Sequence, residues 1–158
     1  MGEWKLPPKA KIYEALSAIG DGRVTVVGPG EAQVASSDRS KTYAVEWSED
    51  LRQFTSNDNA SYWQGYTGYP IVAVLMLLGR LDFSKETAAL LSGIPWKLLN
   101  RRFRNDYAKA IESVFDDLEA KGAPREPIIA EVDRILLQLE GLTLEKLPRR
   151  KRPPKEAK

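Results

Sequence analysis

Two groups of basic residues are the clearest candidates for chemistry in this sequence. The first lies in the segment WKLLNRRFRNDYAK, where cations surround Phe103 and Tyr107. The second is RRKRPPKEAK at residues 149–158, which has six Lys or Arg residues and one Glu. Cations near aromatic rings suit nucleic acids, because cations displace the counterions of phosphates and rings stack on bases. The candidate nucleic-acid contacts are Lys97, Arg101, Arg102, Arg104, Arg149, Arg150, Lys151 and Arg152.

Both groups also have a simpler interpretation. Phe103 and Tyr107 occupy apolar positions of a helical pattern, so the rings can belong to the core and the cations to a solvated face. Residues 149–158 can act only as a solubilising tail, since contacts to phosphates carry no sequence information. The remaining residues, 1–148, carry 18 of the 24 basic and 21 of the 22 acidic side chains, so the basic character is concentrated in the tail.

A third candidate is the segment of small polar residues and aromatics at residues 57–69. Its one carboxylate, on Asp58, is too few for a calcium loop. The favoured interpretation is structural: the small residues let the backbone turn, and the aromatics close over the following apolar helix with their polar ends in water. The alternative is a ligand or partner site made by Asp58, Tyr62, Trp63, Tyr66 and Tyr69.

The chain of 158 residues contains no Cys and no His. This excludes thiolate nucleophiles and disulfides, and it removes the commonest general base and the commonest metal ligand. The glycines at residues 28–30 lack the Lys-Ser/Thr of a phosphate loop, and no two carboxylates form a recognisable acid–base pair. The sequence therefore predicts a protein that is not an enzyme and that has no metal site and no cofactor.

The composition is that of a soluble globular protein, with 42% hydrophobic and 29% charged residues. The first residues, MGEWKLPPKAK, lack the apolar stretch of a signal peptide. The longest apolar run, residues 71–78, is much shorter than the roughly 20 residues of a membrane helix. We expect a cytoplasmic protein with no membrane partner. Few Asn and Gln and no Cys would suit a thermophilic source.

Hydrophobic periodicity predicts the elements that position these candidates. The residues KAKIYEALSAIG predict a helix that ends at Gly20 or Gly22. Short segments rich in β-branched and aromatic residues predict an antiparallel meander of three or four strands over residues 23–56. Residues 71–78 have no polar side, so a helix from Pro70 to about Gly79 should be surrounded by the sheet and other helices.

The C-terminal half is predicted to be helical. Ser84 should cap a short helix that ends at Leu91. Residues 95–121 can form one long helix, or two if Asn105 or Asp106 caps the second. Another amphipathic helix should run from Pro127 to about Gly141. The prediction is an α+β protein with a single domain over residues 1–148, made of the meander at 23–56, the loop at 57–69 and helices within 70–147, followed by a disordered tail at 149–158.

Residues 31–79 resemble the SWIM zinc-finger module. The matching pieces are VASS at 34–37, TYAV at 42–45, Ile71, Ala73 and Leu75. The family has a Cys-x-Cys pair and a Cys-x-His pair, which would fall near residues 55–58 and on Gly68 and Pro70, where this chain has neither residue. The resemblance implies a metal-free relative, in which aromatic packing replaces zinc and which interacts with nucleic acids or proteins. An unrelated meander followed by a buried helix would look the same.

Three functions remain open on this basis. The leading hypothesis is a non-enzymatic interaction module that associates with DNA or RNA, without sequence specificity, through the flexible basic tail. The first alternative is an assembly subunit that binds a protein partner or forms a homodimer through its C-terminal helices. The second alternative is a small-molecule-binding protein that uses the loop at residues 57–69.

Overall fold

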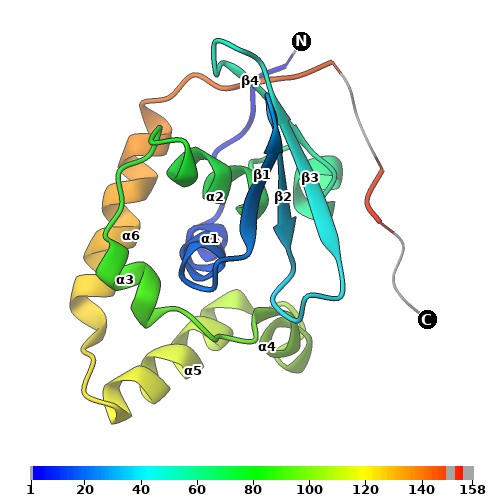
Figure 1. The fold of residues 1–158 in the computed structure, drawn as a ribbon. Coiled ribbons are helices and arrows are strands. Elements are labelled where there is room, and N and C mark those ends of the chain that lie inside the picture. Colours follow the sequence, from blue (N-terminus) through cyan, green and yellow to red (C-terminus); the bar gives the residue numbers. More distant parts are fainter. Residues whose placement is uncertain (1, 149–151, 155–158) are drawn as a thin grey trace.

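The computed structural model describes residues 2–148 and 152–154 (Figure 1). An α+β arrangement with an N-terminal helix and a helical C-terminal half is confirmed. Residues 149–151 and 155–158, which make up most of the predicted tail, lie outside the described residues. The elements are α1 (Lys9–Gly20), β1 (Val24–Gly28), β2 (Glu31–Ala35), β3 (Thr42–Trp47), β4 (Gln53–Ser56), a π-helical turn η1 (Ala60–Gln64), α2 (Tyr69–Leu77), α3 (Lys85–Leu90), α4 (Trp96–Arg102), α5 (Tyr107–Ala120), α6 (Arg125–Glu140) and β5 (Glu145–Lys146).

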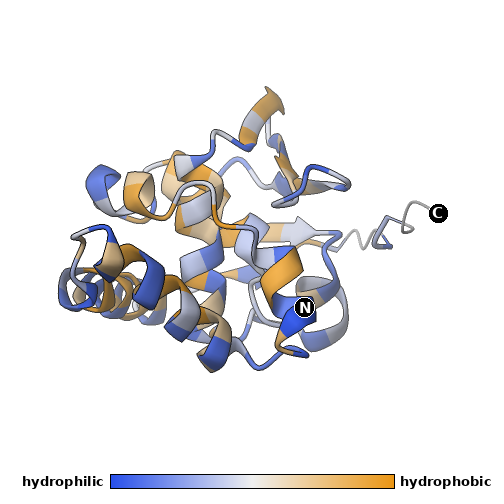
Figure 2. Cartoon of the chain, turned by 90° about the horizontal axis from the view of Figure 1, so that it is seen from below, coloured by the Kyte–Doolittle hydropathy of each residue, from blue (hydrophilic) through white to orange (hydrophobic). Residues whose placement is uncertain are grey.

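The first four strands form the predicted antiparallel meander, and a short fifth strand joins it. The strand order is β1-β2-β3-β4-β5, and β5 runs parallel to β4 with Phe54 opposite Lys146. The prediction that the elements within residues 70–147 are all helices is therefore wrong at β5. At the other end of the sheet, β1 is an edge strand whose residues Val26 and Val27 are about half exposed, and it is coloured as hydrophobic at the margin of the molecule (Figure 2).

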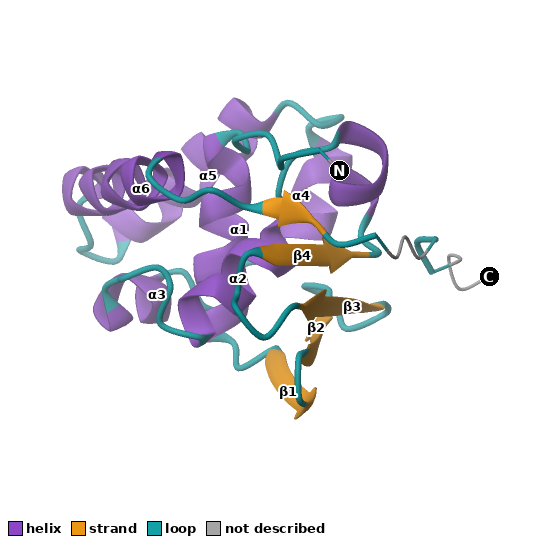
Figure 3. Cartoon of the chain, turned by 90° about the horizontal axis from the view of Figure 1, so that it is seen from above, coloured by secondary structure: helices purple, strands orange, loops and turns teal. Residues whose placement is uncertain are grey.

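Helices α1 and α2 form the centre of the molecule. α1 is buried at every residue from Ala10 to Ala18, and α2 at every residue from Pro70 to Met76. α2 packs against β1, β3 and β4, while α1 packs against α2, α3, α5 and α6. The pair thus lies between the sheet and α6 (Figure 3). The predicted burial of the apolar helix is confirmed except in its last turn, where Leu77 is 45% exposed.

Residues 95–121 form two helices. α4 ends at Arg102, and both Arg104 (φ 52°) and Asn105 (φ 62°) adopt the left-handed conformation that turns the chain. The side chain of Asp106 then accepts a hydrogen bond of 3.2 Å from the amide of Lys109 and caps α5. Of the two capping residues that the sequence left open, Asp106 is therefore the cap.

The remaining helix ends also follow local rules. The hydroxyl of Ser84 accepts a hydrogen bond of 3.2 Å from the amide of Thr87, so the predicted cap of α3 is confirmed. α6 begins at Arg125, earlier than the predicted Pro127, and the guanidinium of Arg125 forms an ion pair of 2.7 Å with Glu119 of α5. No helix among the described residues has the length and apolar character needed to cross a membrane.

Gly20 allows α1 to approach α3, because a Cβ at this position would lie 2.1 Å from the carbonyl oxygen of Ala88. We expect Gly20→Ala to lower the free energy of unfolding by about 1–3 kcal/mol, since overpacking separates the two helices and outweighs the gain of at most ~1 kcal/mol in helix propensity. Urea denaturation measures this change.

The matched control is Gly28→Ala in β1, where nothing lies within 4 Å of the added Cβ. Its free energy of unfolding should change by less than about 1 kcal/mol, the usual range for glycine in a regular element. Equal losses in the two variants would show that the contact between α1 and α3 is not the cause.

Candidate functional site

Hydrogen bonds hold the joint between β4 and α2, which comprises residues 57–68. The buried carboxylate of Asp58 accepts hydrogen bonds from the hydroxyl of Ser56 (2.5 Å) and the amide of Ser61 (3.0 Å). The hydroxyl of Ser61 in turn accepts a hydrogen bond of 3.0 Å from the amide of Gly68. A Cβ on Gly68 would lie 2.1 Å from Oδ2 of Asp58, so glycine permits this approach. Asp58 therefore stabilises the conformation of the joint.

The predicted loop candidates are divided between two pockets. Asp58 and Tyr69 line a pocket of about 460 Å³ beside α1 and α4. Tyr62 and Trp63 line another of about 380 Å³, which also includes residues from both ends of the chain. Tyr66 lines neither of these pockets. The segment 57–69 thus contributes lining residues to two pockets and does not form a site by itself.

The first pocket, called the basic pocket from here on, has more cations than carboxylates. Three of its cations and both carboxylates are buried. The lining has three more cations than carboxylates, although Asp21 and Asp38 outside the lining pair with Arg23 and Lys97, and a lining in which cations predominate attracts anions. The cations are Lys11, Arg23, Lys41, Lys97 and Arg101, and the carboxylates are Glu14 and Asp58.

Helix α1 supplies the charged floor of the basic pocket. Nζ of Lys11 lies 3.4 Å from Oε2 of Glu14 and 4.9 Å from the centre of the Tyr107 ring. Burial alone would lower the pKa of Lys11, but the charge of Glu14 and the nearby tyrosines outweigh burial, so the pKa is raised. Lys11 therefore remains a positive charge at neutral pH and is unsuited to act as a general base.

Arg23 and two tyrosines form the wall beside the sheet. Arg23 donates from Nε to a carboxylate oxygen of Asp21 (2.9 Å) and from Nη1 to the carbonyl oxygen of Ala35 (2.7 Å). Its guanidinium lies 6.0 Å from the centre of the Tyr69 ring, which meets the Tyr43 ring edge to face. Burial raises the pKa of Tyr43 to about 12 and also raises that of Tyr69, so both phenols stay protonated.

The loop between β2 and β3 holds α4 against the pocket. The amide of Lys97 donates to the hydroxyl of Ser37 (2.9 Å), and its Nζ donates to the hydroxyl of Ser40 (2.7 Å). Nζ of Lys97 also lies 3.5 Å from a carboxylate oxygen of Asp38. The first cation of the predicted cluster is thus fixed at the rim of the pocket.

The structure separates the other predicted cations of this segment. Arg101 lines the basic pocket, and its guanidinium forms no hydrogen bond or ion pair with the part of the chain that the structure describes. Arg102 and Arg104 are exposed and do not line the pocket. Phe103 is half-buried against the core, as the simpler interpretation expected. Arg152 is exposed, whereas Arg149, Arg150 and Lys151 lie outside the described residues.

Three of the four asparagines in the chain line the basic pocket: Asn59, Asn100 and Asn105. Nδ2 of Asn100 donates a hydrogen bond of 2.8 Å to Oε1 of Glu14, and this donor requirement orients the amide. Oδ1 of Asn100 is buried without a hydrogen-bond partner among the described residues. Because buried polar atoms are normally paired, this marks an incompletely satisfied polar site.

Sequence reasoning missed most of this pocket. Its groups come from α1, the β2–β3 hairpin, the joint and α4, which are distant in sequence. One signal was present: Lys11, Glu14 and Ser17 are spaced by three and therefore form one polar stripe on a helix that is otherwise largely apolar. The lining residues that were not singled out include Lys11, Glu14, Arg23, Lys41, Tyr43 and Asn100.

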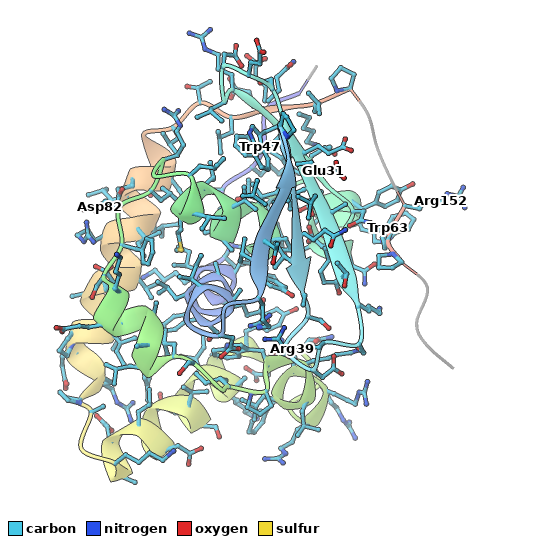
Figure 4. All side chains as sticks on the ribbon, viewed as in Figure 1. Glu31, Arg39, Trp47, Trp63, Asp82 and Arg152 are labelled. Carbon is cyan, nitrogen blue, oxygen red and sulfur yellow. The ribbon has the colours of Figure 1, made fainter. Side chains whose placement is uncertain are left out.

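The second pocket, called the tryptophan groove from here on, is open and aromatic. Trp63 is 69% exposed and meets Tyr62 edge to face, with the ring centres 4.6 Å apart. The prediction that the aromatics of this segment close over the central helix is therefore wrong for Trp63, which projects outward (Figure 4). The groove also includes Trp4, Lys5 and Lys146.

The fold and the two pockets define a class of protein: an α+β domain in which a meander and helices enclose two central helices and leave a basic pocket beside α1. The chain belongs to the family of the uncharacterised conserved protein UCP014422, which it matches over residues 4–145. That range includes the whole basic pocket. Comparisons with curated proteins and with solved structures gave no match.

Alkaline pH should destabilise this protein. Burial raises the pKa of Tyr43, and also that of Tyr13, from 10.0 to about 12. Between these two values the unfolded chain has released phenol protons that the folded chain still holds, so the free energy of unfolding falls as the pH rises. Urea denaturation at a series of pH values from neutral to strongly alkaline measures the slope.

The variant Tyr43→Phe tests the assignment, because it removes one of these protons from the folded and unfolded states alike. Its free energy of unfolding should fall less steeply over the alkaline range than that of the wild type. An unchanged slope would show that Tyr43 does not contribute to the pH dependence.

Proposed function

We propose that this protein is a non-enzymatic binding module that takes up a phosphate-bearing ligand in the basic pocket. The predominance of cations among the lining residues, five against two carboxylates, supports the proposal most directly. Asp21 and Asp38, which lie outside the lining, pair with Arg23 and Lys97, whereas the guanidinium of Arg101 has no such partner in the described part of the chain and is available to an anion. The volume of about 460 Å³ lies in the range of small-molecule sites.

Phosphate suits this arrangement better than a single carboxylate does. The cations come from α1, its following turn, the β2–β3 hairpin and α4, so they surround the space instead of facing one point. A phosphate has several oxygens and up to two charges, and it can contact several cations together. Lys97 and Arg101 are four residues apart on α4 and therefore share a face. The guanidinium of Arg101 can bind two phosphate oxygens side by side.

The ionisable groups of the pocket favour binding over catalysis. The raised pKa of Lys11 keeps its ammonium charged, and the raised pKa of Tyr43 keeps its phenol protonated at neutral pH. The carboxylate of Asp58 is engaged by Ser56 and Ser61. These groups can hold an anion and donate hydrogen bonds, but they are not poised to remove a proton.

The proposal develops one of the hypotheses drawn from the sequence. It keeps a small-molecule site at residues 57–69 but restricts the contribution of that loop to residues 58–60 and Tyr69. Tail-mediated association with DNA or RNA and homodimer formation through the C-terminal helices stay predictions.

Charge reversal at Arg101 tests the proposal. Titration calorimetry with inorganic phosphate, pyrophosphate and adenosine monophosphate should detect binding of at least one of them to the wild type. Arg101→Glu should weaken this binding about tenfold or more, because a hydrogen bond to a charged group contributes about 1.5–3 kcal/mol. Higher salt should weaken binding to the wild type as well, since mobile ions screen the interaction.

Arg102→Glu is the matched control, because Arg102 is the next residue of α4, is also exposed, and does not line the pocket. Its affinity should stay within a few-fold of the wild type. No heat with any of the three phosphates, or an equal loss of affinity in both variants, would contradict the proposal.

A further inference from the structure

We propose that the tryptophan groove is a separate binding site for single-stranded nucleic acid, in which one base stacks on Trp63 and the adjoining phosphates contact Lys5 and Lys146. The groove and the basic pocket have no lining residue in common. The inference therefore does not rest on the function proposed for the basic pocket.

Trp63 has the properties of a stacking platform. At 69% exposure it is the most exposed of the large hydrophobic residues that the structure describes. By contrast, Trp96 is buried and donates from Nε1 to the hydroxyl of Ser17, and Trp4 donates from Nε1 to the carbonyl oxygen of Phe54. An indole that remains in water keeps a large apolar face available for a partner. Every base can stack on such a ring, because every base has an aromatic face.

The local backbone holds this platform in place. Trp63 lies in the π-helical turn η1, a rare element that is frequent at functional sites. Before the turn, Asp58 accepts the hydrogen bond from the amide of Ser61, and after it Gly65 turns the chain with φ 75°. The carbonyl oxygen of Gly65 then accepts a hydrogen bond of 3.0 Å from the amide of Lys5. The platform and Lys5 are thus linked through the main chain.

The charged side chains of the described residues that line the groove are both cations. Its lining residues include Lys5 and Lys146, and those that the structure describes contain no Asp or Glu. Nζ of Lys146 lies 5.1 Å from the centre of the Trp4 ring and would be 3.2 Å from a Cβ on Gly65, so it is held over the end of η1. Two cations in a lining whose described residues have no carboxylates attract a phosphate backbone.

The chain continues from the groove into its most basic segment. Pro148 lines the groove, and the next residues in the sequence are Arg149, Arg150 and Lys151. Arg152 lies on the same side of the molecule as Trp63 (Figure 4). Trp63 of the aromatic loop and Pro148, the residue before the basic tail in the sequence, therefore line the same groove. Aromatic platforms beside a line of cations are typical of single-strand binding.

Other occupants fit the groove less well. A sugar could stack on Trp63, but the hydroxyls of Ser56 and Ser61 are already engaged with Asp58 and the amide of Gly68, and a neutral sugar would make no use of the two lysine charges. An acidic peptide would contact the lysines without using the indole face. In a duplex the base faces are stacked on one another. A single strand presents bases and phosphates together.

The test is fluorescence anisotropy of a labelled oligothymidylate of about 10 nucleotides, a length within the usual site size, titrated with the full chain at low salt. Binding should be measurable, and Trp63→Ala should weaken it about tenfold, whereas Trp63→Phe should retain most of it. The matched control is Leu137→Ala on α6, because Leu137 is 68% exposed and lies outside the groove. Its affinity should equal that of the wild type.

Two further measurements separate stacking from simple charge attraction. Polyglutamate, a polyanion without bases, should compete poorly with the oligonucleotide. Lys5→Gln with Lys146→Gln should make the slope of log affinity against log salt less steep by about 1.4, because each phosphate of a single strand that a lysine neutralises adds about 0.7 to that slope. Absence of binding, wild-type affinity of Trp63→Ala, or equal competition by polyglutamate would overturn the inference. Phosphate titrations of Trp63→Ala should match the wild type, which keeps the two sites distinguishable.

Discussion

The polar stripe on the buried helix α1 constrains the rest of the structure. Its apolar sides can pack against α2, α3 and α6, but Lys11, Glu14 and Ser17 need polar partners because an isolated buried charge is costly. Lys11 and Glu14 pair with each other, Asn100 of α4 donates to Glu14, and Trp96 donates to the hydroxyl of Ser17. α4 must therefore lie along this stripe, and the basic pocket is the space that remains between them.

The joint before α2 shows how a short segment can be held by a few hydrogen bonds. The SWIM resemblance placed metal ligands near residues 55–58 and at Gly68 and Pro70, and it implied that aromatic packing takes the place of zinc. In this chain Asp58 and Ser61 link the two stretches by hydrogen bonds to Ser56 and Gly68. Of the aromatics of this segment, Trp63 is turned to solvent, whereas Tyr69 packs against the core and meets the Tyr43 ring. The resemblance itself stays a prediction.

Local patterns were sufficient for most of the fold. The alternation within β3, the apolar run of α2 and the side chains of Ser84 and Asp106 act over a few residues, so sequence spacing reveals them. β5 has two residues, and its pairing with β4 depends on the path of the whole helical half. The pocket was hidden for a related reason. In the sequence alone, Lys11 and Glu14 have the appearance of solvated charges, since Lys and Glu are seldom buried. The packing of four segments around them is what removes them from water.

The absence of histidine gives both candidate sites a common character. A site that contains histidine changes its charge near neutral pH, whereas Lys, Arg and carboxylates ordinarily titrate well away from it. Neither the basic pocket nor the tryptophan groove therefore has an imidazole whose charge would change near neutral pH. Attraction between fixed charges and a phosphate still weakens as counterions accumulate. Under both proposals the contribution of the protein varies with ionic strength and not through an imidazole, whereas a phosphate monoester adds its own second ionisation at a pKa of about 6.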